Sequence, residues 1–446
     1  MKKLIALLLA AIMIFAFAAC GETKTPPATE NPDATGEPVA TGEPSGEKTV
    51  ADLVAEAANS PVDTANIKAA YEDGSLKIGV ILVGDENEGY TYAHIEGIEQ
   101  AKEALGLSDD QVIYKYRVLE DETCYDTAVS LADQGCQMIF SNSFSHESYM
   151  IQAAAEYPDV VFLPATGTQA ATCGLDNVVN YFPSVYESRY VSGVVAGMKL
   201  AELIENGKLT DANYAADGTV KIGYVGAYPY AEVVSGYTAF FLGVQSIVPN
   251  VSMEVVYTSS WFDIAGEAEA ANSLISRGCC IISQHADSTG APSATQAALD
   301  AGTTVYCVGY NVDMLSVAPT AALTSAQNCW NVLYTDMIGA AIAGEPLAKN
   351  NTASYANDGV QISPLGESCA AGTAEKVDEI IAALKAGELH VFDISKFTMD
   401  GETVTSYTSC WGFEGIETIW DGYFHESELI SAPLFDLRID GITELS

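Results

Sequence analysis

Seven short segments of this chain combine aromatic side chains with amides, carboxylates and hydroxyls. They are residues 84–90 (GDENEGY), 141–144 (SNSF), 165–167 (ATG), 228–230 (YPY), 260–263 (SWFD), 284–287 (QHAD) and 310–313 (YNVD). Aromatic rings stack on the faces of a flat ligand, while amides and carboxylates form hydrogen bonds with its edge. A buried Asp that accepts a ligand N–H makes a charge-assisted hydrogen bond, which is stronger than a neutral one. The segments therefore predict a binding site for a small, neutral, heteroaromatic ligand.

Twelve residues of these segments are the first candidates for ligand binding. They are Asn87, Tyr90, Ser143, Phe144, Tyr228, Trp261, Phe262, Asp263, Gln284, His285, Asn311 and Asp313. Trp261 and Phe262 are the best candidates for stacking, because both follow one predicted strand. Aromatic side chains at the end of a strand can also fill the core, so this alternative stays open for each ring.

The motifs of several catalytic sites are absent from the sequence. No GxSxG, Walker A or GxGxxG motif follows a predicted strand, and the five histidines include no HExxH pair. A zinc site made from His94, His146 and His285 would require the fold to bring three distant residues together. We therefore expect no enzyme activity, no catalytic residues, no metal and no cofactor.

Apolar runs that are typical of buried strands alternate with helical stretches along most of the chain. The expected strands are 77–84, 111–120, 136–143, 159–167, 177–184, 220–229, 252–261, 279–286, 304–311 and 321–328. The expected helices are 92–106, 123–134, 147–156, 188–206, 231–247, 264–277, 291–301 and 329–344. This order predicts an α/β protein with parallel sheets that are covered by helices on both faces.

The alternation restarts near residue 188, and the runs 77–84 and 220–229 resemble each other as opening strands. We therefore expect two doubly wound lobes. Lobe 1 would hold residues 77–187 and a crossover segment near 320–345, and lobe 2 would hold residues 188–319. Residues 350–446 would pack on the lobes. Ligands of such sheets bind beyond the carboxyl ends of the strands, so the seven segments would meet in the cleft between the lobes.

The N-terminal residues have the pattern of an export signal. Lys2 and Lys3 precede an apolar run over 4–19, which is shorter than the ~20 residues of a membrane-spanning helix. Cys20 follows Phe-Ala-Ala, which resembles the lipobox of bacterial lipoproteins, where the cysteine is lipidated. Residues 21–50 contain ATGEP twice and predict a disordered tether. We expect a signal peptide over 1–20 and a lipid-anchored protein on the extracytoplasmic face of the cell membrane. An ordinary signal peptide is the alternative.

The chain is strongly acidic, with 60 Asp and Glu against 19 Lys and Arg and a formal net charge of −41. Such a surface repels nucleic acid, so we expect no nucleic-acid partner. Apart from Cys20, nine cysteines are scattered without a CxxC pair, and their disulfide state stays open.

Eight stretches, in the same order along the chain, resemble the basic membrane protein (Bmp, PnrA-like) family of ABC-transporter substrate-binding lipoproteins. They are residues 88–97, 125–144, 156–167, 185–198, 220–250, 259–278, 281–288 and 308–314. The resemblance implies a type 1 periplasmic-binding-protein fold, in which two lobes joined by a hinge close on a ligand. It also implies a purine-like ligand and an ABC permease as the partner in the membrane.

The resemblance carries some residue roles over to this sequence. In the first loop, Asn87 and Tyr90 hold positions that are an acid and an aromatic residue in nucleoside-binding relatives. At a later strand end, Asn311 and Asp313 match an acidic pair. The other positions carried over are Tyr92, Glu187, Trp261 and Phe262. Glu187 either reaches the cleft or caps the helix that follows it.

One departure from the family pattern bears on the ligand. Relatives place a Lys shortly after a strand like 323–325 (LTS), where it holds ribose hydroxyls, but residues 326–328 are Ala-Gln-Asn here. A nucleobase is therefore favoured over a nucleoside.

Three alternatives stay open, and one of them, a sensor subunit that signals to a membrane kinase, cannot be separated from a transport receptor by sequence. A sugar-binding receptor of the same fold is the first, although none of the four arginines lies in a strand-end segment. An exported hydrolase that uses a pair such as Asp263 and Asp313 is the second.

Overall fold

A computed structural model describes residues 50–57, 59–408 and 415–445, which belong to one compact unit, Lys48–Ser446. The expected signal peptide with Cys20 lies outside the described residues. So does the expected tether, except for Val50, where helix α2 (Val50–Ala57) begins. Eight described cysteines are free, and Cys410 lies outside the described residues. Among the described helices, none is both long and apolar enough to cross a membrane.

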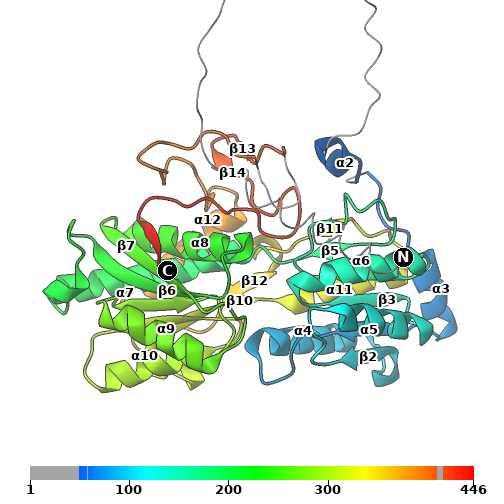
Figure 1. Cartoon of the computed structure of the whole chain (residues 1–446), viewed down its shortest axis with the longest axis horizontal. Coiled ribbons are helices and arrows are strands. Elements are labelled where there is room, and N and C mark those ends of the chain that lie inside the picture. Colours follow the sequence, from blue (N-terminus) through cyan, green and yellow to red (C-terminus); the bar gives the residue numbers. More distant parts are fainter. Residues whose placement is uncertain (1–49, 58, 409–414, 446) are drawn as a thin grey trace, which may run out of the picture. The chain divides into compact units, whose positions relative to one another are not determined.

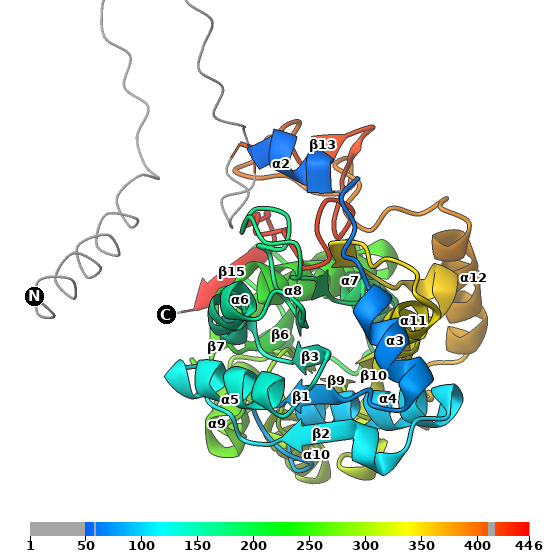
Figure 2. The same cartoon turned by 90° about the vertical axis from the view of Figure 1, so that its right-hand side faces the viewer.

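The first of two large sheets contains four parallel strands, in the order β2-β1-β3-β4. They are β1 (Ile78–Ile81), β2 (Val112–Lys115), β3 (Met138–Ser141) and β4 (Val161–Pro164). Helices α3 (Ala65–Asp73), α4 (Gly89–Leu105) and α11 (Trp330–Ala343) cover one face, and α5 (Glu122–Asp133) and α6 (Glu147–Glu156) cover the other (Figure 2). Along β3, Met138 and Phe140 pack toward the first group of helices and Ile139 toward the second, as expected for a doubly wound sheet.

The second sheet contains seven strands, in the order β12-β10-β9-β8-β6-β7-β15. Figure 1 labels β6, β7, β10 and β12 of this sheet. They are β6 (Val220–Gly226), β7 (Val251–Tyr257), β8 (Ile281–Gln284), β9 (Tyr306–Tyr310), β10 (Ala322–Asn328), β12 (Val360–Ile362) and β15 (Ile442–Leu445). Only β12 is antiparallel to its neighbour. The helices of this lobe are α7 (Val185–Glu205), α8 (Ala231–Ile247), α9 (Ile264–Ser276), α10 (Gly290–Asp300) and α12 (Thr373–Lys385). The expected type 1 fold of two doubly wound lobes is confirmed.

The remaining elements are short. Two pairs of two-residue strands are β5 (Asn180–Tyr181) with β11 (Asn350–Asn351), and β13 (Ile419–Trp420) with β14 (Tyr423–Phe424). The 3-10 turns are η1 (Asp109–Gln111), η2 (Phe144–His146), η3 (Asp211–Asn213), η4 (Met314–Ser316) and η5 (Tyr355–Asn357).

Three segments of the chain cross between the lobes, and hydrogen bonds hold them together. Ser184 N donates to Ala353 O at 2.8 Å, and Cys329 N donates to Gly359 O at 2.9 Å. The expected lobe 1 segment 320–345 is corrected here, because β10 pairs with β9 in the second sheet and only α11 packs on α4. The chain changes lobe at Cys329, between these two elements. The other expected lobe boundaries stay predictions.

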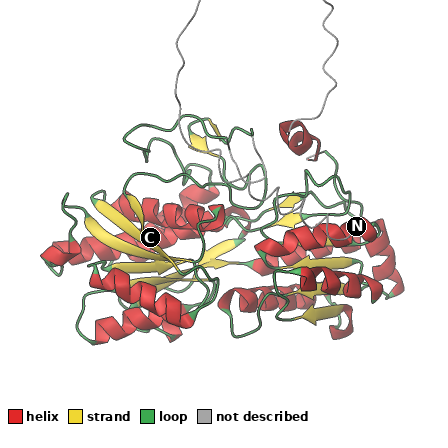
Figure 3. Cartoon of the chain, viewed as in Figure 1, coloured by secondary structure: helices red, strands yellow, loops and turns green. Residues whose placement is uncertain are grey.

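The C-terminal residues add to the second lobe. Strand β15 pairs in parallel with β7 and lengthens the sheet by one strand. Between α12 and β15 the chain is mostly loop (green in Figure 3), and its aromatic rings extend the core, with Phe392 stacked on Phe435 at 4.2 Å. A long loop segment is held here by buried apolar side chains rather than by a regular sheet.

Helices α7 and α8 pack closely because glycines lie at their contact. A Cβ atom added to Gly193 would overlap the carbonyl oxygen of Phe240, and one added to Gly243 would overlap that of Tyr190. Both glycines are needed for the close approach of the two helices. Gly339 in α11 differs, because the nearest atom to its added Cβ would be Leu105 Cδ2 at 3.5 Å, an ordinary contact distance.

We predict that Gly193→Ala destabilises the protein and that Gly339→Ala does not. The first change forces α7 and α8 apart, and overpacking of this kind costs about 1–3 kcal/mol. The second change adds only the helix preference of Ala, which is about 1 kcal/mol better than that of Gly. Urea unfolding of both variants measures the difference. Equal midpoints for the two variants would contradict the close packing of α7 on α8.

Candidate ligand-binding site

A chamber lies where strands of both sheets end, between the two lobes. Its lining residues are Val83, Glu88, Tyr90, Asn142, Ser143, Phe144, Thr166, Glu232, Trp261, His285, Asp287 and Tyr310. Each of them lies at the end of a strand or in the segment that follows it. The strands are β1, β3 and β4 in the first lobe and β6, β7, β8 and β9 in the second. The chamber has about 430 Å³ of space that atoms do not fill, including solvent at its mouth. We call it the first chamber.

Aromatic rings form one side of the first chamber. Phe144 comes from the first lobe and stacks on Tyr230 of the second lobe, with ring centroids 5.5 Å apart. Tyr230 stacks on Tyr228 at 5.1 Å, and Tyr228 meets the edge of Trp261 at 5.2 Å. Phe144 and Trp261 line the chamber, while Tyr228 supports Trp261 from behind. This arrangement offers flat apolar surfaces to a flat ligand.

Three carboxyl groups, Glu88, Glu232 and Asp287, also line the first chamber. Asp287 Oδ1 accepts a hydrogen bond from Asn311 Nδ2 at 2.7 Å. Asn311 has a left-handed backbone (φ 62°), a conformation that Asn adopts more readily than most residues. Thr91 Oγ1 donates to Glu88 from the first turn of α4. Each of these two acids is therefore held by a neighbour of its own lobe.

Burial raises the pKa of all three carboxyl groups. The pKa of Glu232 rises to about 7. Burial is also the largest cause for Glu88 and Asp287, and the carboxylates of Glu88, Glu267 and Glu232 raise the pKa of Asp287 further. An ionised carboxylate in a buried site needs hydrogen bonds to replace those it made with water. Ligand N–H groups would supply such bonds.

One positive group lies behind the chamber. Arg189 of α7 is fully buried, its guanidinium carbon lies 3.6 Å from the ring centre of Tyr310, and Nη1 donates to Gln284 O at 2.6 Å. His285 Nε2 lies 3.2 Å from Glu232 Oε1. Burial, and then the charge of Arg189, lower the pKa of His285 well below its usual range, so this imidazole is neutral. The described lining of the chamber therefore contains three acids and one neutral histidine, with the guanidinium of Arg189 behind it.

The structure brings five of the predicted site residues together in the first chamber. They are Tyr90, Ser143, Phe144, Trp261 and His285. Their assignment as ligand contacts stays a prediction.

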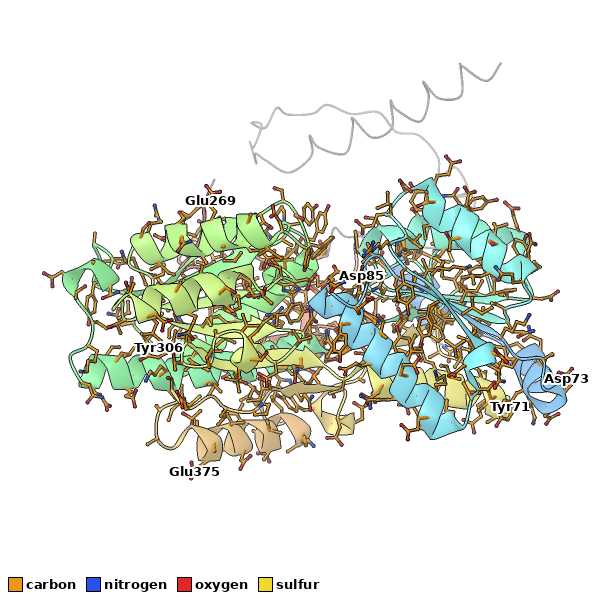
Figure 4. All side chains as sticks on the ribbon, turned by 90° about the horizontal axis from the view of Figure 1, so that it is seen from below. Tyr71, Asp73, Asp85, Glu269, Tyr306 and Glu375 are labelled. Carbon is orange, nitrogen blue, oxygen red and sulfur yellow. The ribbon has the colours of Figure 1, made fainter. Side chains whose placement is uncertain are left out.

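Four other predicted residues line an outer groove between the two lobes, which shares Asp287 with the first chamber. They are Asn87, Tyr92, Phe262 and Asp313. Phe262 is 39% exposed, whereas its neighbour Trp261 faces the chamber. Asp85, labelled in Figure 4, lies just before α4 and accepts hydrogen bonds from both nitrogens of Asn87 at 2.9 Å.

The last five predicted residues line neither space, and their side chains have other contacts. Asp263 caps α9 by accepting from Ala265 N and Gly266 N. Gln284 Nε2 donates to two backbone carbonyls of the loop that carries His285 and Asp287.

Glu187 does not reach the first chamber. It accepts from Tyr355 N at 2.8 Å, so it links α7 to η5 near the crossing segments. Tyr228 and Asn311 act behind the chamber, on Trp261 and Asp287.

Sequence reasoning missed seven residues of the chamber. They are Val83, Glu88, Asn142, Thr166, Glu232, Asp287 and Tyr310. Five of them lie inside the strand-end segments singled out from the sequence, so their position in these segments could have identified them as candidates. Glu232 gave a weaker signal, because an acid in the first turn of a helix is common for reasons of helix polarity alone.

Comparisons with known proteins agree with this geometry. The family described as Bmp, ABC transporter substrate-binding protein PnrA-like, matches residues 76–383. A purine-binding protein of Brucella abortus is 32% identical over 325 residues, which cover 73% of this chain and 85% of that protein. A putative ABC transporter glucose-binding protein of Haloferax volcanii is 32% identical over 296 residues, which cover 64% of each chain.

Solved structures show the same fold. A solute-binding protein of an ABC transporter from Aeropyrum pernix aligns with a TM-score of 0.59 at 15% identity and covers 71% of this chain and 93% of its own. One from Conexibacter woesei aligns with a TM-score of 0.55 at 21% identity and covers 71% and 98%. Because the family match spans residues 76–383 and contains the ends of β1 to β9, this chain belongs to the Bmp family of PnrA-like ABC transporter substrate-binding proteins.

Proposed function

We propose that this protein captures a purine-like ligand between its lobes and delivers it to an ABC permease. The observation that carries the proposal is the joint lining of one chamber by the rings of Phe144 and Trp261 and by three buried carboxyl groups. A purine has two flat faces for the rings and N–H groups at its edge for the carboxylates. The purine-binding relative from Brucella abortus supports the same ligand class.

A nucleobase suits the site better than a nucleoside. Relatives have a ribose-holding Lys near the positions of residues 326–328, which lie in β10 here and are Ala-Gln-Asn. Gln327 Nε2 donates to Asn311 O at 3.1 Å. The lining of the first chamber contains no Lys or Arg. A ribose would therefore lack a cation to hold its hydroxyls.

Capture would proceed by closure of the lobes about the three crossing segments. Gly89 at the start of α4 already lies against the second lobe, since an added Cβ would be 3.3 Å from Asp287 O. The described arrangement is thus a closed one, in which ligand contacts come from both lobes. The closed form is the state that a permease would recognise.

A sugar is the second candidate ligand. The relative from Haloferax volcanii that is named as a putative glucose-binding protein favours it. Against it, Arg189 lies behind Tyr310 and does not line the chamber, so it is not placed to bridge sugar hydroxyls.

We predict that purine bases raise the thermal midpoint of the purified protein and that glucose and other hexoses do not. A ligand that binds only the folded state stabilises it by an amount that grows with the logarithm of its concentration over Kd. Differential scanning fluorimetry with adenine, hypoxanthine, guanine, their nucleosides and hexoses measures this. A shift from a hexose with none from any purine would defeat the purine proposal and support the sugar.

Two neighbouring aromatic residues provide a matched control for this test. Trp261→Ala should weaken purine binding by about 1–3 kcal/mol, the usual contribution of one stacked ring. Phe262→Ala should leave binding nearly unchanged, because Phe262 lines the outer groove. Isothermal titration calorimetry separates the two, and equal losses would contradict the placement of the ligand against Trp261.

We predict that purine affinity rises by about tenfold between pH 6 and pH 8, if ionised Glu232 accepts the ligand N–H. Burial raises the pKa of Glu232 to about 7, and a carboxyl with that pKa passes from mostly protonated to mostly ionised in this window. Asp287 and Arg189 face the same group, and His285 stays neutral because its pKa is low. Calorimetry at several pH values measures the slope.

The variant Glu232→Gln is the control for the pH dependence. It keeps the size of the side chain and removes the titrating proton, so the profile should flatten. An affinity that falls as the pH rises would mean that a protonated carboxyl donates to the ligand instead.

We also propose that lipidated Cys20 and the tether hold the protein beside its permease outside the cytoplasmic membrane. Anchoring raises the effective concentration of the receptor without adding contacts, and it needs more than one acyl chain. Cys20→Ser should release the protein into the medium with its ligand affinity unchanged, as fractionation and calorimetry would show. Loss of ligand binding in this variant would contradict the separation of anchor and receptor.

A further inference from the structure

Arg189 of α7 is a buried cation whose nitrogens form no hydrogen bond with any described carboxylate. Its side chain is fully buried, and Nη1 donates to a backbone carbonyl, Gln284 O, at 2.6 Å. Nε and Nη2 have no hydrogen-bond partner among the described residues. Burial of a charged group with so few partners is costly, so its presence calls for an explanation. Packing does not supply one, because an apolar side chain of similar size would fill the same space without this cost.

The guanidinium of Arg189 lies directly behind the wall of the first chamber. Its carbon is 3.6 Å from the ring centre of Tyr310, and that ring lines the chamber. Gln284, whose carbonyl accepts from Nη1, comes directly before His285 and Asp287, which are two more lining residues. Arg189 therefore supports two parts of the chamber wall without lining the chamber itself.

Gly236 of α8 leaves the space in which Arg189 and His285 meet. A Cβ atom added to Gly236 would lie 2.6 Å from Nδ1 of His285 and 3.6 Å from Nε of Arg189. Glu232 lies one turn before Gly236 on the same face of α8, and its Oε1 is 3.2 Å from Nε2 of His285. Arg189, His285 and Glu232 thus belong to one buried cluster at the start of α8.

Arg189 supplies the positive charge of this cluster. The other titratable groups that face Glu232 are Glu88, Tyr90, Tyr224, His285, Asp287 and Tyr310. Burial raises the pKa of the three tyrosines and lowers the pKa of the histidine, so these four groups are neutral. Burial also raises the pKa of Glu232, and the charge of Arg189 opposes this rise, so that the pKa is about 7. Water screens such buried charges poorly.

We propose that Arg189 is a positioning residue for ligand capture, and that its buried charge favours the ionised form of Glu232, the form that accepts a ligand N–H. This inference rests on the proposed function, in which Glu232 is such an acceptor. It goes further by assigning the pH range in which the receptor works to a residue that does not touch the ligand. Loss of the charge would move ligand binding to higher pH.

Three substitutions separate the charge of Arg189 from its packing. Arg189→Met removes the charge and keeps most of the length of the side chain. Arg189→Gln is a second neutral variant, and it retains an amide donor for Gln284 O. Arg189→Lys keeps the charge. Titration calorimetry of the full chain with adenine, from about pH 6 to about pH 9, measures the affinity of each variant.

We expect the two neutral variants to lose affinity at low pH and to recover it at high pH. A neighbouring opposite charge commonly moves the titration of a carboxyl group by about one pH unit or more. Arg189→Met and Arg189→Gln should therefore bind adenine about tenfold more weakly than the wild type at about pH 6, and within about twofold of it at about pH 9. The recovery also shows that the variants are folded. Arg189→Lys should stay within about threefold of the wild type throughout.

Infrared spectroscopy of the unliganded protein tests the same charge effect without a purine. The absorption of a protonated carboxyl that Glu232→Gln removes belongs to Glu232. In the wild type this absorption should disappear as the pH rises through neutrality, and in Arg189→Met and Arg189→Gln it should persist to higher pH.

Two results would overturn the role of Arg189. One is an equal loss of adenine affinity at every pH, which is the behaviour of a residue that only supports the wall. The other is an infrared titration of Glu232 that both neutral variants leave unchanged. A wild type that binds no purine would instead overturn the proposed function, while a shifted infrared titration would still support the effect of Arg189 on Glu232.

Discussion

Acidic side chains of both lobes meet in one chamber, and the rest of the site is arranged around this constraint. Glu88 belongs to the first lobe, while Glu232 and Asp287 belong to the second. The charge of Glu88 raises the pKa of Asp287, so the two acids oppose each other in the closed form. Burial of charge without partners is costly. A ligand with N–H donors would remove that cost and thereby favour closure.

Each lobe holds one of its acids with a hydrogen bond from a neighbouring side chain. Asn311 and Thr91 hold Asp287 and Glu88 by short hydrogen bonds within their own lobes. In the second lobe, the glycine contacts of α7 and α8 leave little room for these helices to shift. A movement of one lobe relative to the other would therefore take place at the three crossing segments. A rigid lobe that carries preformed ligand contacts loses less entropy on binding.

The fold could be predicted from the sequence because both sheets consist of parallel strands that are buried on both faces. Such strands are continuous apolar runs, and the helices between them end at clear turns. Strand β10 was assigned to the wrong lobe, since the pattern of a run does not say which sheet it joins. The pairing of β10 with β9 is a long-range contact that only the structure gives.

The site was harder to predict, for local reasons. Trp261 and Phe262 are adjacent and chemically alike, yet only Trp261 faces the chamber. Asp263 is of a residue type that is common in ligand contacts, but its carboxylate caps α9. Glu232 has the position of an ordinary helix-start acid but lines the first chamber. Strand-end position identified most of the segments that line the chamber, while the direction of each side chain depended on packing.

The acidity of the first chamber does not make it a site for cations. Burial raises the pKa of Glu232 to about 7 and that of Asp287 well above its usual range, so protonation of these groups reduces the negative charge of the chamber. The guanidinium of Arg189, 3.6 Å from the ring centre of Tyr310, offsets part of the charge that remains. A cationic ligand would have to ionise the acids and would also face Arg189 across one ring. A neutral ring avoids the repulsion by Arg189, keeps its faces against Phe144 and Trp261, and can form a hydrogen bond with these carboxyl groups in either protonation state.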